Sequence, residues 1–337
     1  MFVLHSYPLA VAFCVITMLC WGSWANTQKL AGQRWRFELF YWDYVLGVVL
    51  LTTIFAFTLG NNGGPEGRGF LADVRQAAPE CIGSAVLGGV VFNAANILLV
   101  AAIDIAGMAV AFPVGIGLAL VLGVVVNYEG PGKANPLLLF AGVAFIVAAI
   151  LLDALAYRRV PGQAKGVSAK GLILAIACGI LMGFFYRFVA RSMSSESRHF
   201  VTLDAGKMGP YAAVFFFSIG MLISNLVFNT LIMVRPFRGS PLRAVDYLRG
   251  TASQHLVGVL GGAIWGVGNL FSFIAFGIAG PAISYGLGQG ATLVAALWGV
   301  FVWREFRNAP RGTGLLLALM FAGYVIGLTL VIAARVG

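Results

Sequence analysis

Two stretches of the chain determine its fold: residues 88–121, GGVVFNAANILLVAAIDIAGMAVAFPVGIGLALV, and residues 261–294, GGAIWGVGNLFSFIAFGIAGPAISYGLGQGATLV. The second repeats the first after 173 residues, and twelve positions are identical, among them the paired glycines at the start and Asn96 with Asn269. About three identities are expected by chance between stretches this rich in Gly, Ala, Val and Leu. The match therefore indicates an internal duplication.

Both stretches are strongly apolar, and so is the rest of the 337-residue chain. Hydrophobic residues make up 60% of it and charged residues only 10%, and its mean hydropathy is +0.92. Because soluble domains are about a quarter charged, this chain has too few charges to cover a surface that faces water. The composition predicts an all-α integral membrane protein, since a helix satisfies its own backbone hydrogen bonds in lipid.

Ten apolar windows of about 20 residues are long enough to cross a bilayer as helices. They cover residues 8–29, 40–60, 80–102, 107–128, 135–156, 171–191, 209–234, 255–278, 281–303 and 312–335. The duplication divides them into a first five-helix repeat at 1–156 and a second at 171–337, joined by a cytoplasmic linker at 157–170. Because five is odd, the two repeats are predicted to be inverted in the membrane, as in many secondary transporters.

The formal net charge of +10 describes topology and does not point to a nucleic-acid partner. Nucleic-acid binding would need the cations clustered on a wet face, whereas here they lie in short connections between apolar windows. Lys and Arg are more frequent in the connections that follow odd-numbered helices, for example at Arg235, Arg238, Arg243 and Arg249. By the positive-inside rule these connections are cytoplasmic, so both termini are predicted to lie outside the cell (inner) membrane.

Polar side chains inside the windows are costly in lipid and are the first candidates for a substrate path. The candidate substrate-binding residues are Trp21, Trp24, Asn26, Gln28, Asn93, Trp265, Asn269, Tyr285 and Gln289. Trp21, Trp24 and Gln28 share one helix face by their spacing, and so do Tyr285 and Gln289. Since aromatic rings stack on a ring and amides pair with carbonyl, amine or hydroxyl groups, these residue types suit a small neutral polar metabolite.

Several of the candidates also have a structural role open to them. The two tryptophans of the first window fit an interfacial belt. The asparagines fit hydrogen bonds between helices, which contribute about 0.6 to 2 kcal/mol in membranes. Arg187, late in the sixth window, fits either a side chain that reaches the interface or one that meets ligand oxygens.

Carboxylates are scarce inside the windows. Asp43 and Asp153 are the only two that lie well within one, and neither is central. A proton-driven exporter of organic cations is expected to carry a central carboxylate whose raised pKa lets it bind a proton, so a neutral solute is favoured. Asp43 is a candidate site for a coupling proton or a sodium ion.

Motifs of enzymes and of metal or cofactor sites are absent from the sequence. It contains no His-Glu-x-x-His and no Gly-x-Ser-x-Gly motif, and the four cysteines have no metal-ligand spacing. The three histidines, His5, His199 and His255, are scattered at or beyond the ends of the windows. We therefore expect no catalytic residue, no metal and no cofactor, and the chain is not predicted to be an enzyme.

Two further patterns carry a family resemblance. The run 107–126 followed by Glu129 recurs as 280–302 followed by Glu305, and in this it resembles the drug/metabolite transporter superfamily. Gly22-Ser23-Trp24 and Tyr41-x-Asp43-Tyr44 are similar to motifs of the plant ureide permeases and of bacterial glucose and ribose porters. The resemblance implies ten helices in inverted repeats and a ureide, nucleobase or sugar as cargo, moved inward with a cation.

These observations predict a permease that takes up a small neutral polar metabolite by alternating access. Export of metabolites or drugs by the same fold is the second hypothesis, and a membrane scaffold without transport is the third. The partners expected are the metabolite and the lipid bilayer. Oligomeric state has no signal in the sequence.

Overall fold

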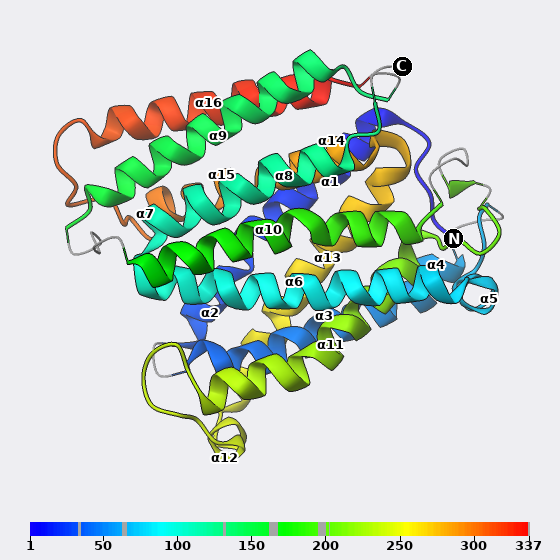
Figure 1. Cartoon of the computed structure of the whole chain (residues 1–337), viewed down its shortest axis with the longest axis horizontal. Helices are drawn as coiled ribbons and strands as arrows, with labels where there is room; N and C mark the ends of the chain where they lie inside the picture. Colours follow the sequence, from blue (N-terminus) through cyan, green and yellow to red (C-terminus); the bar gives the residue numbers. More distant parts are fainter. Residues whose placement is uncertain are drawn as a thin grey trace. The chain divides into compact units, whose positions relative to one another are not determined.

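The computed structural model of the chain describes residues 1–32, 35–62, 66–130, 133–161, 168–194, 200–201 and 203–335, and these residues form helices and connections (Figure 1). Among them, nine helices are long and apolar enough to cross a membrane, and Phe112–Asn127 is a shorter apolar helix. The prediction of an all-α integral membrane protein with ten spans is confirmed. Arg34, Arg198, His199 and part of the predicted linker, residues 162–167, lie outside the described residues.

The spans follow the predicted windows to within a few residues. They are α1 (Tyr7–Ser23) with α2 (Ala25–Ala31), α3 (Phe37–Phe57), α6 (Pro79–Ala106), η1 (Phe112–Ile116) with α8 (Gly117–Asn127), α9 (Pro136–Arg158), α10 (Ala169–Ser192), α11 (Pro210–Val234), α13 (Ala252–Ala279), α14 (Pro281–Gly288) with α15 (Ala291–Leu297) and η3 (Trp298–Val302), and α16 (Thr313–Ala333). In the described parts of the connections there are four short helices: α4 (Leu59–Asn62), α5 (Phe70–Gln76), α7 (Met108–Ala111) and α12 (Ala244–Leu248).

The chain folds into two compact units that each combine segments from both halves of the sequence. The first unit is Met1–Asn93 with Arg187–Ile278, and the second is Ala94–Tyr186 with Ala279–Gly337. The predicted repeats at 1–156 and 171–337 are therefore a division of the sequence and not of the compact units. That division stays a prediction.

In the first unit, α3 and α13 approach so closely that only glycine fits at the crossing. A Cβ atom on Gly47 would overlap the carbonyl oxygen of Val259, and one on Gly262 would overlap the carbonyl oxygen of Tyr44. Small residues at such crossings let apolar helices gain van der Waals contact in lipid, where burial of apolar surface gives them no advantage.

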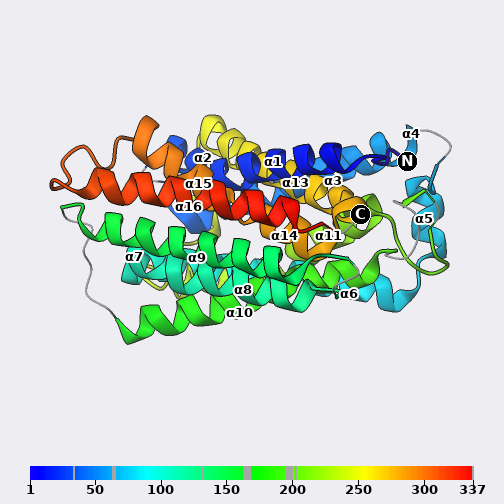
Figure 2. The same cartoon turned by 90° about the horizontal axis from the view of Figure 1, so that it is seen from above.

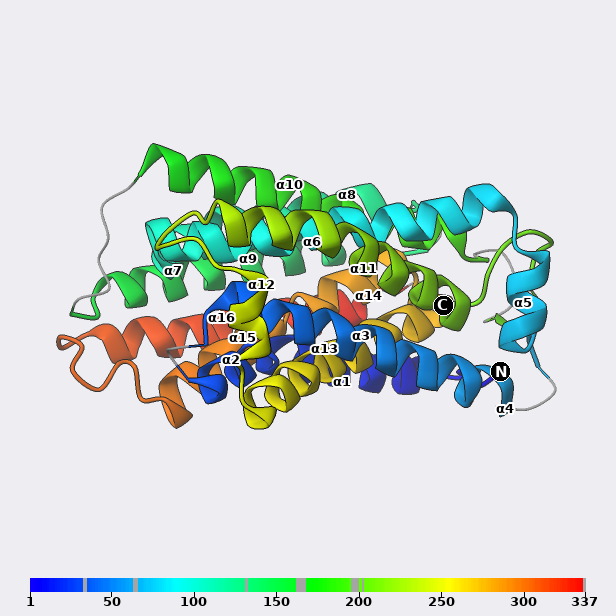
Figure 3. The same cartoon turned by 90° about the horizontal axis from the view of Figure 1, so that it is seen from below.

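The pair α6 and α11 repeats this crossing, and α11 also lies beside α3 (Figure 3). A Cβ atom on Gly220 would overlap the carbonyl oxygen of Val86, and one on Gly89 would overlap that of Phe217. Each of these four residues is 173 positions from its counterpart in the α3–α13 crossing. The duplication seen in the sequence thus extends to equivalent backbone contacts.

The second unit is built on α9 and α16, which pack along their length (Figure 2). Gly142 and Gly327 face each other at this crossing, and a Cβ atom on either would lie 2.7 or 2.8 Å from the carbonyl oxygen of the other. Beside them α8 packs on α14, where the Tyr285 ring occupies the space left by Gly123. Both units therefore rely on glycine at their helix crossings.

We expect Gly262→Ala to lower the unfolding temperature of the detergent-purified protein by several degrees. The added methyl group overlaps backbone, and overpacking of this kind costs about 1–3 kcal/mol. Gly89→Ala is expected to behave in the same way, because it disturbs the equivalent crossing. Gly83→Ala is the control, since nothing lies within 4 Å of its Cβ position. Unchanged unfolding temperatures for Gly262→Ala and Gly89→Ala would contradict the close-packed crossings.

Candidate functional site

A break between α1 and α2 places two of the predicted tryptophans. The helix is interrupted at Trp24, where Thr27 donates from its hydroxyl to the Trp24 carbonyl at 2.6 Å and Asn26 donates to the Ser23 carbonyl at 3.0 Å. These side-chain bonds compete with the regular helix ladder and so stabilise the break. Trp21 lies one turn before it, with the indole Nε1 buried and without a partner among the described residues.

An aromatic cluster in the first unit surrounds Trp265 of α13. Ring centroids lie 4.4 Å away at Phe92, 5.9 Å at Phe217, 6.1 Å at Trp21 and 6.3 Å at Tyr44. The 173-residue shift relates Trp265 to Phe92 and Tyr44 to Phe217, so the cluster brings together two duplicated ring pairs. The two predicted residues Trp21 and Trp265 stack on each other within it.

Asn269 lies one turn beyond Trp265 and is fully buried. Neither its amide nitrogen nor its amide oxygen has a hydrogen-bond partner among the described residues. The preceding residue, Gly268, is in contact with Trp21, because a Cβ atom there would lie 3.1 Å from the indole Nε1. A buried polar group without a partner costs about 1–3 kcal/mol. The segment around Asn269 and Trp21 therefore presents unused donors and an unused acceptor beside a stacked ring pair.

The other candidates of the first unit either make contacts between helices or are half-buried. Asn93 of α6 donates to the Ser224 hydroxyl of α11 at 2.9 Å, which ties these helices together, while its Oδ1 has no partner among the described residues. Gln28 is half-buried on α2, and Arg187 is half-buried near the end of α10. Trp24 packs on Tyr44 at 4.7 Å.

Tyr285 and Gln289 belong to the second unit. The Tyr285 hydroxyl lies 3.1 Å from the Ala119 carbonyl and 3.2 Å from the Met182 carbonyl, so it connects α14 with α8 and α10. Gln289 is buried just after α14. These contacts give Tyr285 a structural role.

Asp43 is the centre of a polar cluster that includes residues from α3, α12 and α13. Its side chain is 3% exposed, accepts a hydrogen bond from the Tyr247 hydroxyl at 2.5 Å and lies 2.9 Å from Nδ1 of His255. The carboxylate fits against α13 because Gly258 has no side chain there. Trp35 packs edge-on against the His255 ring at 5.2 Å. Asp43, Tyr247, His255 and Trp35 are called the Asp43 cluster below.

Sequence reasoning identified Asp43 but did not consider Tyr247, and it treated His255 as one of three scattered histidines. Tyr247 and His255 are more than 200 positions from Asp43 along the chain. One signal was available: the 173-residue shift maps Asp43 to Phe216 and His255 to Ile82, so neither member of this polar pair has a polar counterpart in the other repeat. Asn225 of α11 was also missed; it is fully buried and neither of its amide atoms has a partner among the described residues.

The Asp43 cluster combines a hydroxyl donor, an imidazole and a carboxylate acceptor. Burial, and then the hydrogen bond to the carboxylate, raise the pKa of the Tyr247 phenol above its ordinary value, so this hydroxyl stays a donor. Imidazole and carboxylate side by side can exchange a proton. The described residues contain no group of three or more His, Cys, Asp or Glu side chains that could hold a metal ion.

A second acidic position lies in the second unit. Tyr157, near the end of α9, donates to the Glu305 carboxylate at 2.8 Å. Asp153 is buried one turn before it. Glu305 is the acidic residue that follows the ninth span in the sequence pattern. By accepting this hydrogen bond it anchors the end of α9.

Comparison with known proteins gives matches along almost the whole chain. The profile of the family described as ureide permease matches residues 40–166 and 158–334. Ureide permease 1 of Arabidopsis thaliana is 22% identical over 99% of both chains. A probable glucose uptake protein of Priestia megaterium is 24% identical over 74% of this chain and 80% of its own. A solved crystal structure with 17% identity has a TM-score of 0.63 over 96% of this chain and 98% of the other, which shows a shared fold.

We expect Asn269→Leu to leave the unfolding temperature unchanged or to raise it by a few degrees. Leucine has the same number of side-chain heavy atoms and the same branching at Cγ, and it removes a buried amide that has no partner among the described residues, a replacement that can be neutral or stabilising. Asn93→Leu is the matched variant and is expected to lower the unfolding temperature, because the 2.9 Å bond to Ser224 is lost. If Asn269→Leu destabilised the protein as much as Asn93→Leu, Asn269 would be a structural residue.

Proposed function

The chain belongs to the ureide permease family, and from that membership we propose that it takes up a small neutral polar metabolite, such as a ureide, a nucleobase or a sugar. Its relatives are named permeases and uptake proteins, which are transporters. The prediction of a multi-pass membrane transporter in place of an enzyme is thus confirmed. The substrate class, the direction and the coupling are the proposed part.

One observation carries the choice of a neutral polar substrate. The buried amide of Asn269 and the indole nitrogen of Trp21 have no partners among the described residues. Trp21 stacks on Trp265, and Asn269 lies one helical turn beyond Trp265. A ligand with both donors and acceptors would satisfy these groups, and its hydrogen bonds would offset the cost of their burial. A charged ligand would instead need a buried countercharge, whereas the residues of this site are amide and aromatic.

The duplication supports alternating access as the transport mechanism. The crossings at Gly47–Gly262 and at Gly220–Gly89 use equivalent residues 173 positions apart. Two five-helix repeats of opposite orientation can exchange conformations and so expose one site to each side in turn. In this proposal the arginine-rich connections face the cytoplasm and both termini lie outside the cell membrane.

The Asp43 cluster is the proposed coupling site. A sodium ion is usually held by several oxygen ligands, whereas two of the groups around Asp43 are a tyrosine hydroxyl that donates to it and an imidazole. This chemistry favours a proton. Since Asp43 bridges α3 to α12 and α13, a change in its protonation would alter the hydrogen bonds between these helices.

We expect purified protein in liposomes to accumulate at least one of allantoin, uracil and glucose as radiolabelled solute. Asn269→Leu is expected to lower the initial rate at least tenfold, because about 1.4 kcal/mol of binding free energy corresponds to a factor of ten. Thr329→Val is the control: it also removes a polar group from a span, but among the described residues that hydroxyl donates to its own helix, at the Val325 carbonyl. Failure of all such solutes, with the protein protecting intact cells from toxic compounds instead, would establish export and overturn uptake.

We expect Asp43→Asn to abolish accumulation against a gradient while exchange across preloaded liposomes continues. Exchange needs only the loaded carrier, whereas accumulation needs the coupling ion. For the wild type, an inward proton gradient should drive uptake and a protonophore should stop it. Uptake driven by a sodium gradient alone, or accumulation retained in Asp43→Asn, would contradict the assignment of the coupling site.

A further inference from the structure

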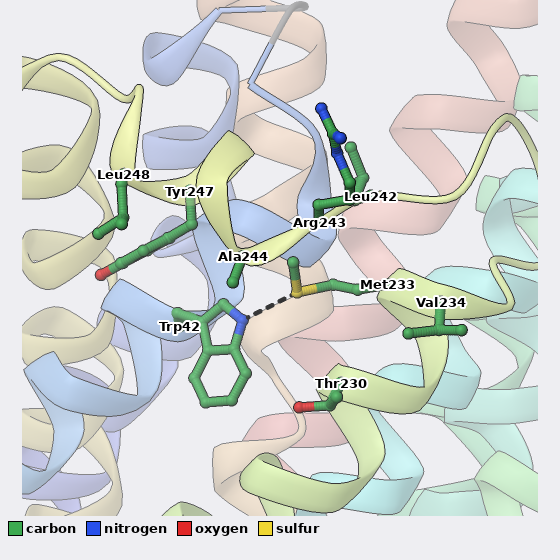
Figure 4. Close-up of a pocket in the computed structure, with 9 residues that line it drawn as sticks. All are labelled: Trp42, Thr230, Met233, Val234, Leu242, Arg243, Ala244, Tyr247 and Leu248. Carbon is green, nitrogen blue, oxygen red and sulfur yellow. Dashed lines mark hydrogen bonds between the residues drawn. The ribbon is translucent and has the colours of Figure 1, made fainter.

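An open groove in the first unit contains none of the residues proposed to bind the substrate. It encloses about 380 Å³ at the end of the span α11 (Figure 4). Its walls include Trp42 of α3, Met233 and Val234 of α11, and Ala244, Tyr247 and Leu248 of α12. These side chains are mainly apolar, so the groove suits a hydrocarbon chain.

The walls of the groove are held in place by hydrogen bonds. The Trp42 indole donates to the Met233 sulfur at 3.1 Å, which Figure 4 shows as a dashed line. The connection after α11 is folded back, because the Leu242 amide donates to the Met233 carbonyl at 2.7 Å. Tyr247 is fixed by its bond to Asp43. The groove is therefore a built feature of the fold.

Two properties of the groove's rim point to its occupant. Leu248 is 76% exposed and Val234 is 56% exposed, so the groove continues into an apolar surface at the end of a membrane span. The connection that closes it, residues 235–249, carries Arg235, Arg238, Arg243 and Arg249 against Asp246 as its only acid. Arg243 itself lines the groove. Basic segments at the end of a span attract anionic lipid headgroups.

We propose that this groove binds an anionic glycerophospholipid, with an acyl chain between Trp42 and α12 and the phosphate at Arg243. Arginine forms strong, charge-assisted hydrogen bonds with phosphate. Trp42 lies where tryptophan is favoured in membrane proteins, near the end of a span.

The site would also connect lipid to transport, because Tyr247 belongs to both structures. One face of this residue lines the groove, and its hydroxyl donates to Asp43. A bound acyl chain would hold Tyr247 in contact with the carboxylate. This regulatory step rests on the proposed transport function, whereas the binding of lipid does not.

Binding is tested by fluorescence of the purified protein in neutral detergent, titrated with phosphatidylglycerol or phosphatidylcholine brominated on the acyl chains. We expect phosphatidylglycerol to quench saturably, with an apparent affinity about fivefold above that of phosphatidylcholine, the preference that one arginine near a headgroup provides. The saturable part should disappear in Trp42→Phe. Arg243→Gln should remove the preference, whereas Arg311→Gln, an exposed arginine outside the groove, should keep it.

A second variant tests the groove itself. Ala244→Phe places a ring in the space for the acyl chain and should abolish the saturable quenching, whereas Ala318→Phe, on the exposed side of α16, should not. Equal quenching by the two lipids in the wild type, or unchanged quenching in Ala244→Phe, would overturn the lipid site.

The regulatory step is tested in liposomes of phosphatidylcholine with and without phosphatidylglycerol. We expect uptake to be faster with the anionic lipid, and Ala244→Phe to lose this difference. Equal rates for the wild type would overturn the connection to Tyr247. Absence of uptake in both membranes would contradict the proposed transport function, and the quenching titration would then still decide the lipid site.

Discussion

The first unit depends on helix crossings at which a glycine faces a backbone carbonyl. In lipid, apolar helices gain nothing from burying apolar surface against each other, so their association must come from close packing and from hydrogen bonds. Gly262 on Tyr44 and Gly89 on Phe217 supply the close packing. The same residues bring the aromatic rings of α3, α6, α11 and α13 within reach of Trp265. The close helix crossings are therefore a precondition for the aromatic cluster around Trp265.

The duplication is preserved in the packing and in Asn96 with Asn269, but it is broken at Asp43 and His255. The glycine crossings and the ring pairs have counterparts 173 residues away, as expected of a scaffold. Asp43 and His255 have the apolar counterparts Phe216 and Ile82. A buried carboxylate is costly in a membrane span and needs hydrogen-bond partners. Tyr247 and His255 are the partners of Asp43. Because Asp43 departs from the repeat in spite of the cost of burying a carboxylate, we propose a functional role for it, in coupling.

The sequence predicted the parts of the fold that follow from apolar length, and it predicted less well what depends on distant contacts. All ten spans and the class of fold were within reach, because a bilayer imposes one length on every helix. Trp21, Trp265 and Asn269 could be named from the cost of polar and aromatic groups in spans. Tyr247 could not, because its contact with Asp43 arises only when α12 folds back onto α3, and His255 was marked only by the apolar residue at its repeat position. The compact units, which mix both halves of the chain, were also not evident from the sequence.

The central claim is that the unused hydrogen-bonding groups around Asn269 serve a neutral polar ligand. Its most direct test is a thermal-shift titration of the detergent-purified wild type and of Asn269→Leu with allantoin, uracil and glucose. A ligand at a hundred times its dissociation constant stabilises a protein by about 2.7 kcal/mol. We predict that at least one of these solutes raises the unfolding temperature of the wild type by several degrees and has no effect on Asn269→Leu. An equal shift in both proteins, or none in the wild type, would contradict the claim.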